Sequence, residues 1–308
     1  MSSKNWLRFW AAGLIWGTSF LWIKIAVSQI SPFVLAGFRA LFGTLGMVVI
    51  ILLNKKLRPN WHTLRPWLGI FAFIGFTNVA LPFVLISWGE QYISSGIASV
   101  LNSTTPLFTI ILAAIFLQED RLTLPKVLGL LTGFGGVVLL FLPEISSSHI
   151  ENLLGLGAVL IASAGYALSG IVIKRKVHGL APELQVFLQY AFAALMIFCI
   201  TLGVERPVIL PALPITWIAL LWLGLLGSSL ASSLQFALLH SVGPTRASTV
   251  TYVPPLVGLL LGAIFLGESL GWQSLIGGAL IVIGIILVNM QRSPFKLPTS
   301  EDSQTSED

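Results

Sequence analysis

Long apolar runs separated by short polar gaps follow one another along the whole chain. Each run is close to the roughly 20 mostly apolar residues that a membrane-crossing helix needs. The gaps contain helix-breaking pairs such as Ser31-Pro32, Ala181-Pro182 and Gly243-Pro244. The pattern predicts ten transmembrane helices, at residues 6–27, 32–53, 66–88, 93–117, 123–142, 152–173, 182–203, 213–239, 245–267 and 272–291. The polar residues 292–308 predict a disordered tail on the cytoplasmic side.

Composition places these helices in a lipid bilayer. Hydrophobic residues make up 56% of the chain and charged residues 9%, whereas soluble domains carry roughly a quarter charged residues. The mean hydropathy of +0.91 also indicates that lipid surrounds most of the chain. We expect no nucleic-acid partner, because the basic residues gather in the gaps between spans. The one cysteine, Cys199, excludes an intrachain disulfide and a thiolate metal site, and we expect no metal and no cofactor.

The positions of the basic residues predict the orientation. Cytoplasmic loops hold most of the Lys and Arg residues of a membrane protein. If the N-terminus faces the cytoplasm, the inner side receives all of the seventeen basic residues except Lys24, Arg39 and Arg206. We therefore expect a multi-pass protein of the cell membrane with both termini cytoplasmic, and the short loops fit a bacterial inner membrane.

One segment of the chain occurs twice. The residues TPLFTIILAAIFLQED at 105–120 resemble PPLVGLLLGAIFLGES at 254–269, with an offset of 149 that aligns Pro106 with Pro255. Earlier in each half, an offset of 150 aligns further identical residues, such as Pro32 with Pro182. A similarity of this extent indicates a duplication. It predicts two five-helix repeats, at 1–146 and 147–291.

A repeat of five spans enters the membrane from opposite sides in its two copies. The halves then have inverted topology, and each can adopt the conformation of the other, so that a cavity between them opens to alternate sides. We therefore predict a secondary transporter that works by alternating access around a site near the membrane midplane, and not an enzyme. A channel stays an alternative. So does an integral-membrane enzyme acting on lipid-linked substrates, which would need clustered carboxylates, histidines or a metal site.

The ten-span duplication resembles the EamA family of the drug/metabolite transporter superfamily. The resemblance rests on WGTSFLWIKIAV in the first span, SPFVLAGFRALFG in the second, and the segments ending in AIFLQE and AIFLGE that close the fourth and ninth. It covers about residues 6–290. Members export amino acids, other small metabolites or toxic compounds, so the resemblance implies a small-molecule substrate. It also places an arginine at the position of Arg39.

Prolines interrupt the fourth and ninth spans. Pro106 cannot donate a hydrogen bond to the carbonyl of Asn102, and Pro255 likewise frees the carbonyl of Thr251. Free carbonyls at membrane depth are tolerated only against protein or a water-lined cavity. Two kinked helices with polar neighbours predict a substrate site between them, and the alternative is a packing kink satisfied by threonine hydroxyls. The candidate residues are Asn102, Thr105, Pro106, Thr251, Tyr252, Pro254 and Pro255.

Aromatic and cationic residues add further candidates. Trp16 lies within the first span and Tyr166 is its repeat partner, so both could stack on a substrate, with lipid or core packing as the alternative. Arg39 lies about seven residues into the second span, roughly 10 Å deep. It could hold a substrate carboxylate, although we favour snorkelling or the bracing of neighbouring helices. Snorkelling also explains Lys24.

Glutamates near the ends of spans complete the candidate set. Glu119 and Glu268 occupy equivalent places in the two repeats, and we predict that they are structural gate or hinge residues that bond the amides of a neighbouring helix or pair with a cation. The spans contain no deep Asp or Glu, which favours facilitative transport unless Glu90 or Glu183 near a gate binds protons. Glycine pairs at 129 and 133 and at 258 and 262 predict close packing between neighbouring helices. A homodimer stays an alternative.

Overall fold

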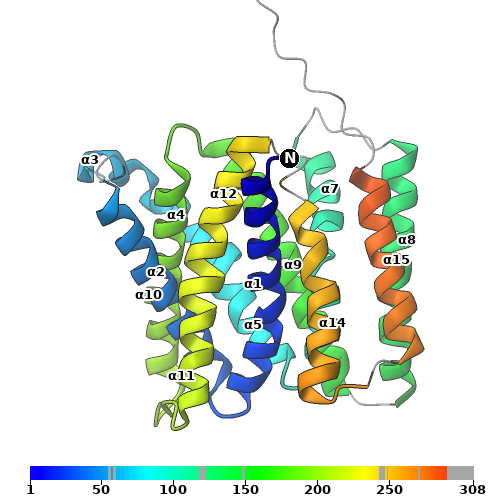
Figure 1. Ribbon diagram of the computed structural model, residues 1–308. Helices are drawn as coiled ribbons and strands as arrows, with labels where there is room; N and C mark the ends of the chain where they lie inside the picture. Colours follow the sequence, from blue (N-terminus) through cyan, green and yellow to red (C-terminus); the bar gives the residue numbers. More distant parts are fainter. Residues whose placement is uncertain are drawn as a thin grey trace, which may run out of the picture.

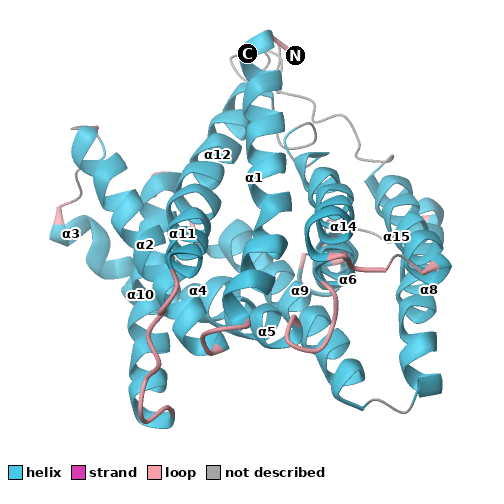
Figure 2. Ribbon diagram, turned by 60° about the horizontal axis from the view of Figure 1, so that its bottom comes forward, coloured by secondary structure: helices cyan, strands magenta, loops and turns pink. Residues whose placement is uncertain are grey.

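The computed structural model describes residues 1–54, 57, 60–117, 123–147, 150–242, 247, 249–269 and 271–289, and every regular element in these ranges is a helix (Figures 1 and 2). In these ranges, nine helical segments are long and apolar enough to cross a bilayer, and Trp272–Val288 is a shorter apolar helix. They match the ten predicted spans, which confirms the all-α membrane fold. The predicted tail at 292–308 lies outside the described residues.

Six of the spans consist of one helix each. Local sequence explains where some of them begin. Ser31 caps the second span, because its hydroxyl accepts a hydrogen bond from the amide of Val34 (3.1 Å). Pro32 and Pro182 stand at first helical positions, where a missing N–H costs nothing. The six helices are α1 (Ser3–Val27), α2 (Pro32–Leu53), α8 (Leu124–Ser147), α9 (Ile150–Lys176), α10 (Pro182–Val204) and α15 (Trp272–Asn289).

The third and eighth spans contain a π-helical segment each. At the offset of 150 residues, η3 corresponds to 226–230, the last five residues of the longer segment η4. Each widens its helix locally, a geometry that is frequent at functional sites. The third span consists of α3 (Trp61–Leu64), η2 (Arg65–Trp67), α4 (Leu68–Gly75), the π segment η3 (Phe76–Ala80) and α5 (Leu81–Gly89). The eighth consists of α11 (Pro214–Leu221), the π segment η4 (Trp222–Leu230) and α12 (Ala231–Val242).

The fourth span is broken near its middle by a turn at Ser103 and Thr104, and the ninth changes from a 3-10 helix to an α-helix between Tyr252 and Val253; we call both the broken spans. The fourth consists of α6 (Ser95–Asn102) and α7 (Thr105–Phe116), and the ninth of η5 (Thr249–Tyr252) and α14 (Val253–Leu266). Pro106 stands in the first turn of α7, and Pro254 in the first turn of α14. The prolines therefore begin new helices, where the sequence had predicted a kink within a continuous helix.

The spans pack in pairs that are related by an exchange of the two halves. The second span packs on the seventh (α2 on α10) and the fifth on the tenth (α8 on α15). Contacts of α1 with α14 correspond to those of α9 with α7, and contacts of α1 with η4 to those of α9 with η3. This is the pattern that a duplicated bundle predicts, and the inversion of the repeats stays a prediction. The beginning of α1 and the end of α15 lie at the same end of the bundle (Figure 1). After the predicted orientation, we call this end the inner end and the opposite end the outer end.

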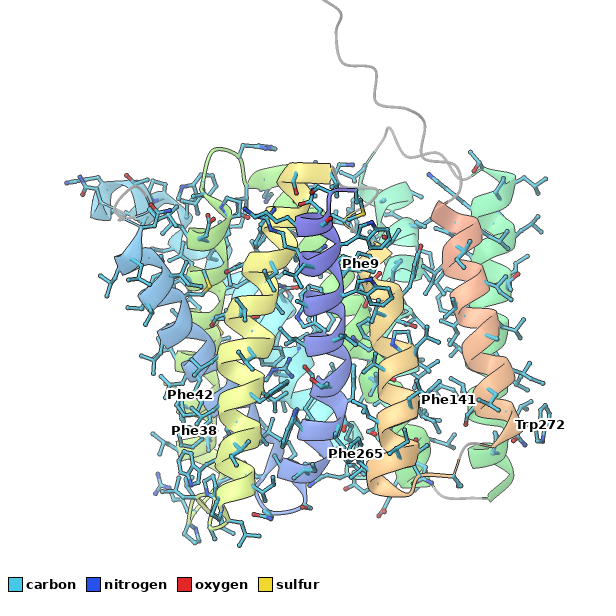
Figure 3. The ribbon with its side chains drawn as sticks, in the orientation of Figure 1. Phe9, Phe38, Phe42, Phe141, Phe265 and Trp272 are labelled. Carbon is cyan, nitrogen blue, oxygen red and sulfur yellow. The ribbon has the colours of Figure 1, made fainter. Side chains whose placement is uncertain are left out.

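Large apolar side chains cover the outside of the bundle, as lipid requires. Leu53 is 82% exposed and Ile264 is 70% exposed, and Trp272 projects away from the bundle at the outer end of α15, a position typical of an interfacial belt (Figure 3). Between helices, glycines allow close approach. A Cβ atom placed on Gly136 of α8 would lie 2.5 Å from the carbonyl oxygen of Gly277 in α15.

Candidate functional site

A cavity of ≈ 350 Å³ lies where the broken and widened spans meet. Both predicted halves contribute to its wall, and among the described residues that line it Arg39 is the only charged one. The wall consists of Trp16, Ser19, Phe20 and Ile23 of α1, Arg39 of α2, Asn78 of η3, Phe83 and Ile86 of α5, Ser99 and Asn102 of α6, Ser103, Thr105 and Pro106, Tyr166 of α9, Tyr190 of α10, Gly227 of η4, Ser232 of α12, Thr251 and Pro254. A larger hollow of ≈ 790 Å³ lies beside Trp67 and Lys176, and it shares no lining residue with this cavity.

The structure brings most of the predicted site residues together. Eight of them line this one cavity: Trp16, Arg39, Asn102, Thr105, Pro106, Tyr166, Thr251 and Pro254. Tyr252 and Pro255 are adjacent in sequence to wall residues but do not belong to the wall. Glu268 lies at the outer end, and Glu119 lies outside the described residues. Sequence reasoning missed Asn78, Phe83 and Tyr190, although Asn78 is a polar residue within an apolar span.

Arg39 is held inside the bundle by an aromatic ring. Its side chain is only 8% exposed, and its guanidinium carbon lies 3.8 Å from the centroid of the Phe83 ring. A cation over a ring face is stabilised by the ring quadrupole, more strongly when both are desolvated. The Nε atom is buried and has no hydrogen-bond partner among the described residues. This buried position does not fit snorkelling, and it leaves the Nε–H without a described partner.

The break between α6 and α7 combines a satisfied carbonyl with an unsatisfied side chain. The backbone carbonyl of Asn102 accepts hydrogen bonds from the hydroxyls of Thr105 (2.9 Å) and Ser163 (3.4 Å). This is the hydroxyl compensation that the packing alternative predicted. The side-chain Oδ1 of Asn102, in contrast, is buried and has no partner among the described residues. The break therefore holds a buried acceptor without a described partner on a residue that lines the same cavity as Arg39.

The π segments supply further groups to the wall. The indole N–H of Trp16 donates to the carbonyl of Gly227 in η4 (3.0 Å), which fixes the ring at the cavity. In η3, the amide nitrogen of Asn78 donates to Oε1 of Gln189 in α10 (2.6 Å). Gln189 is the predicted repeat partner of Arg39. The π segments thus contribute the carbonyl that holds the Trp16 ring and the amide that pairs with Gln189.

At the outer end, Glu268 joins α14 to the beginning of α6. Its carboxylate accepts hydrogen bonds from the Ser95 amide (2.7 Å), the Ser95 hydroxyl (3.0 Å) and the Gly96 amide (3.1 Å). A carboxylate at a helix N-terminus also interacts favourably with the helix dipole. A Cβ atom on Gly262 would collide with this carboxylate, so glycine leaves the room that the contact needs. We call these three hydrogen bonds the outer clamp; that they act as a gate stays a prediction.

Lys24 and Glu90 occupy the same outer region. The ammonium of Lys24 donates to the backbone carbonyls of Glu90 and of Ile93 (2.8 Å for Ile93). Glu90 stands at the end of α5, as the sequence predicts, yet it is completely buried. Sequence position therefore gave no indication that this carboxyl is inaccessible. Among the described residues, no group of three or more His, Cys, Asp or Glu side chains could hold a metal ion.

Comparison with known proteins adds to this geometry. The sequence model of the EamA-like transporter family matches residues 7–142 and again residues 153–290. A protein of Archaeoglobus fulgidus described as an uncharacterized transporter is 30% identical over 94% of this chain and 100% of its own length. The uncharacterized inner membrane transporter YedA of Escherichia coli is 27% identical over 95% of this chain and 94% of its own. A solved crystal structure with 20% identity superposes with a TM-score of 0.65, covering 94% of this chain and 98% of that one, and shows the fold alone.

Proposed function

This chain belongs to the EamA-like transporter family, and we propose that it is a secondary transporter that exports small organic metabolites such as amino acids. Transport proceeds by alternating access around the cavity, which lies between two inverted five-helix repeats at 1–146 and 147–291. The protein spans the cell membrane with both termini in the cytoplasm. The cavity that joins the two broken spans is the observation that carries the proposal.

The chemistry of the cavity supports a ligand with two polar ends. Arg39 offers an unpartnered buried donor, and Asn102 offers an unpartnered buried acceptor. Leaving such a group unsatisfied costs about 1–3 kcal/mol. A ligand that carries both a carboxylate and an N–H group would pair with both and recover that free energy. The rings of Trp16, Tyr166 and Tyr190 offer apolar surface for the remainder of the ligand.

The size of the cavity agrees with a small metabolite. Ligand sites in proteins commonly enclose roughly 300–1,000 Å³, and ≈ 350 Å³ lies at the lower end of this range. The wall also supports movement, because it is built at helix breaks and π segments, where backbone hydrogen bonds can rearrange without melting a helix.

The alternatives differ from this proposal in what they require. A channel would need a continuous path for its solute across the membrane, whereas the outer clamp joins the two halves on the outer side of the cavity. An enzyme acting on lipid-linked substrates would need a cluster of catalytic groups at one interface. Among the described residues of the cavity wall, Arg39 alone is charged, which suits binding better than acid–base chemistry.

A ligand screen tests the proposal and identifies the substrate. Purified protein in detergent is heated with pools of amino acids and organic acids, because a ligand at 100 times its Kd stabilises the folded state by about 2.7 kcal/mol. We expect Arg39→Gln to abolish the stabilisation by carboxylates and Asn102→Ala to weaken it. Arg206→Gln, which changes an exposed arginine, is the matched control. Stabilisation that survives both cavity substitutions would place the ligand elsewhere.

A further inference from the structure

Glu90 is a carboxyl that the transport site does not use. It lies one residue beyond the membrane-spanning segment that ends at Gly89. Its side chain is 0% exposed, and neither carboxyl oxygen has a hydrogen-bond partner among the described residues. An isolated buried carboxylate is so costly that such groups take up a proton instead. The burial and the missing partners together indicate a neutral carboxyl in this conformation.

The groups around Glu90 do not compensate a negative charge by contact. From α1, Lys24 donates to backbone carbonyls, including that of Glu90, while the Glu90 carboxyl oxygens stay without a partner. Arg39 of α2 attracts and Glu268 of the outer clamp repels a negative charge on Glu90. From α9, the carbonyl of Gly155 and the side chain of Val159 lie against the neighbouring Gly89.

The balance of these effects sets the direction of a pH response. Burial raises the pKa of the Glu90 carboxyl well above its ordinary value, and Lys24 lowers it by a smaller amount. If the outer end opens and water reaches the carboxyl, its pKa returns toward the ordinary range. The closed conformation then binds a proton that the open conformation releases. Acid pH therefore stabilises the closed outer end, and this stabilisation is lost as the pH rises through the raised pKa.

Glu90 is also placed to act on both the clamp and the cavity. Ile86, four residues earlier in α5, lines the cavity, and four residues correspond to roughly 6 Å along a helix. Ile93, whose carbonyl binds Lys24, stands two residues before Ser95 of the outer clamp. The segment that carries Glu90 therefore connects the cavity wall to the clamp.

We propose that Glu90 is a proton-binding site that links external pH to the opening of the outer end. The protonated carboxyl belongs to the outside-closed conformation, and the ionised carboxyl to the outside-open conformation. The ligand is a proton, and binding converts the carboxylate to a carboxylic acid without any further reactant. The proposal rests on the alternating access proposed above.

The test measures opening directly. Cys199 is replaced by Ser, and Ser232 of the cavity wall becomes the single cysteine, Ser232→Cys. Intact cells are labelled from outside with a membrane-impermeant maleimide, and each rate is divided by the thiolate reactivity of a free thiol at the same pH. We expect the corrected rate to fall about tenfold between about pH 8 and about pH 5. Glu90→Gln, a neutral isostere, should label slowly at every pH, whereas Glu183→Gln should keep the wild-type profile.

The outcomes separate this proposal from the proposed function. A corrected rate that is independent of pH in the protein with Glu90, or a pH profile that survives in Glu90→Gln, would overturn the role of Glu90. If Glu90→Gln fails to fold, Lys24→Gln provides the test. Loss of the ammonium should move the pH at which the labelling rate is half-maximal to a higher value. An unchanged midpoint refutes the proposal. Substrate exchange measured in the same cells reports on transport. Intact exchange with pH-independent labelling refutes the proton site alone, and absence of exchange refutes the proposed function.

Discussion

The outer clamp makes a quantitative prediction through Glu268→Gln. The carboxylate accepts three hydrogen bonds, at 2.7, 3.0 and 3.1 Å, from Ser95 and Gly96. Glutamine keeps one oxygen acceptor and places an NH₂ group where the second oxygen accepted two of these bonds. Each hydrogen bond to a charged group contributes about 1.5–3 kcal/mol. The substitution should therefore weaken the closed outer end by at least about 2 kcal/mol, and not change the cavity.

This loss converts to a population shift that labelling can detect. With 1.36 kcal/mol per factor of ten, about 2 kcal/mol corresponds to an increase of about 30-fold in the ratio of open to closed molecules. Maleimide labelling of Ser232→Cys from the outside of intact cells, in the Cys199→Ser background, measures this ratio as a rate. We expect Glu268→Gln to accelerate labelling by about 30-fold as long as the open form stays the minor one.

A matched control separates the clamp from a general charge effect. Glu151→Gln removes the same charge from an exposed position in the first turn of α9, and it should leave the labelling rate unchanged. Equal rates for Glu268→Gln and Glu151→Gln would refute the reasoning that the clamp stabilises the closed outer end. An acceleration in both would indicate electrostatics at the membrane surface in place of a specific contact.

Three further experiments test the packing and the cavity. Gly136→Ala should destabilise the bundle by about 1–3 kcal/mol, because the added methyl group overpacks against Gly277. Gly135→Ala is the control: a Cβ atom there has nothing within 4 Å, so the variant should gain up to about 1 kcal/mol from helix propensity. Thermal unfolding in detergent compares the two variants, and equal melting temperatures would contradict the close contact. Trp16→Phe removes the hydrogen bond to Gly227, worth about 1 kcal/mol, so substrate affinity measured by titration should fall about fivefold; an unchanged affinity would show that the indole does not position the ligand. Thr77→Val and Ser169→Ala break one buried hydroxyl contact of 2.7 Å, and their double-mutant cycle in unfolding free energy should give a coupling of about 0.6 kcal/mol; strictly additive effects would argue against the bond.

The sequence predicts the spans well because lipid imposes a simple length and polarity rule. The second span is expected at 32–53 and found at Pro32–Leu53, since Ser31 and Pro32 mark its beginning and an unbroken apolar run follows. The fourth span shows the limit of this rule. Its hydropathy is continuous, but Pro106 begins a new helix after a turn at Ser103 and Thr104. A proline can kink or restart a helix, and the local sequence does not decide between these outcomes.

The candidate site follows from the sequence wherever a polar or kinking residue interrupts an apolar span. Asn102, Thr105 and Pro106 meet this criterion, and they do line the cavity. Phe83 does not, because an aromatic residue in an apolar span carries no signal until its packing against Arg39 is known. The burial of Glu90 is equally invisible, since it depends on the packing of helices distant in sequence. The π segments are not predicted either: Gly75 precedes Phe76–Ala80 and Pro82 follows it, but a proline can also kink a helix or restart it.

The most direct test of the central claim, a carrier with alternating access to one cavity, is counterflow in proteoliposomes. Vesicles loaded with an unlabelled substrate from the ligand screen receive a trace of labelled substrate outside. The account predicts saturable uptake that the internal substrate accelerates, and a lower rate of this uptake in Asn102→Ala. Label that equilibrates without saturation and without acceleration by internal substrate would contradict alternating access and establish a pore.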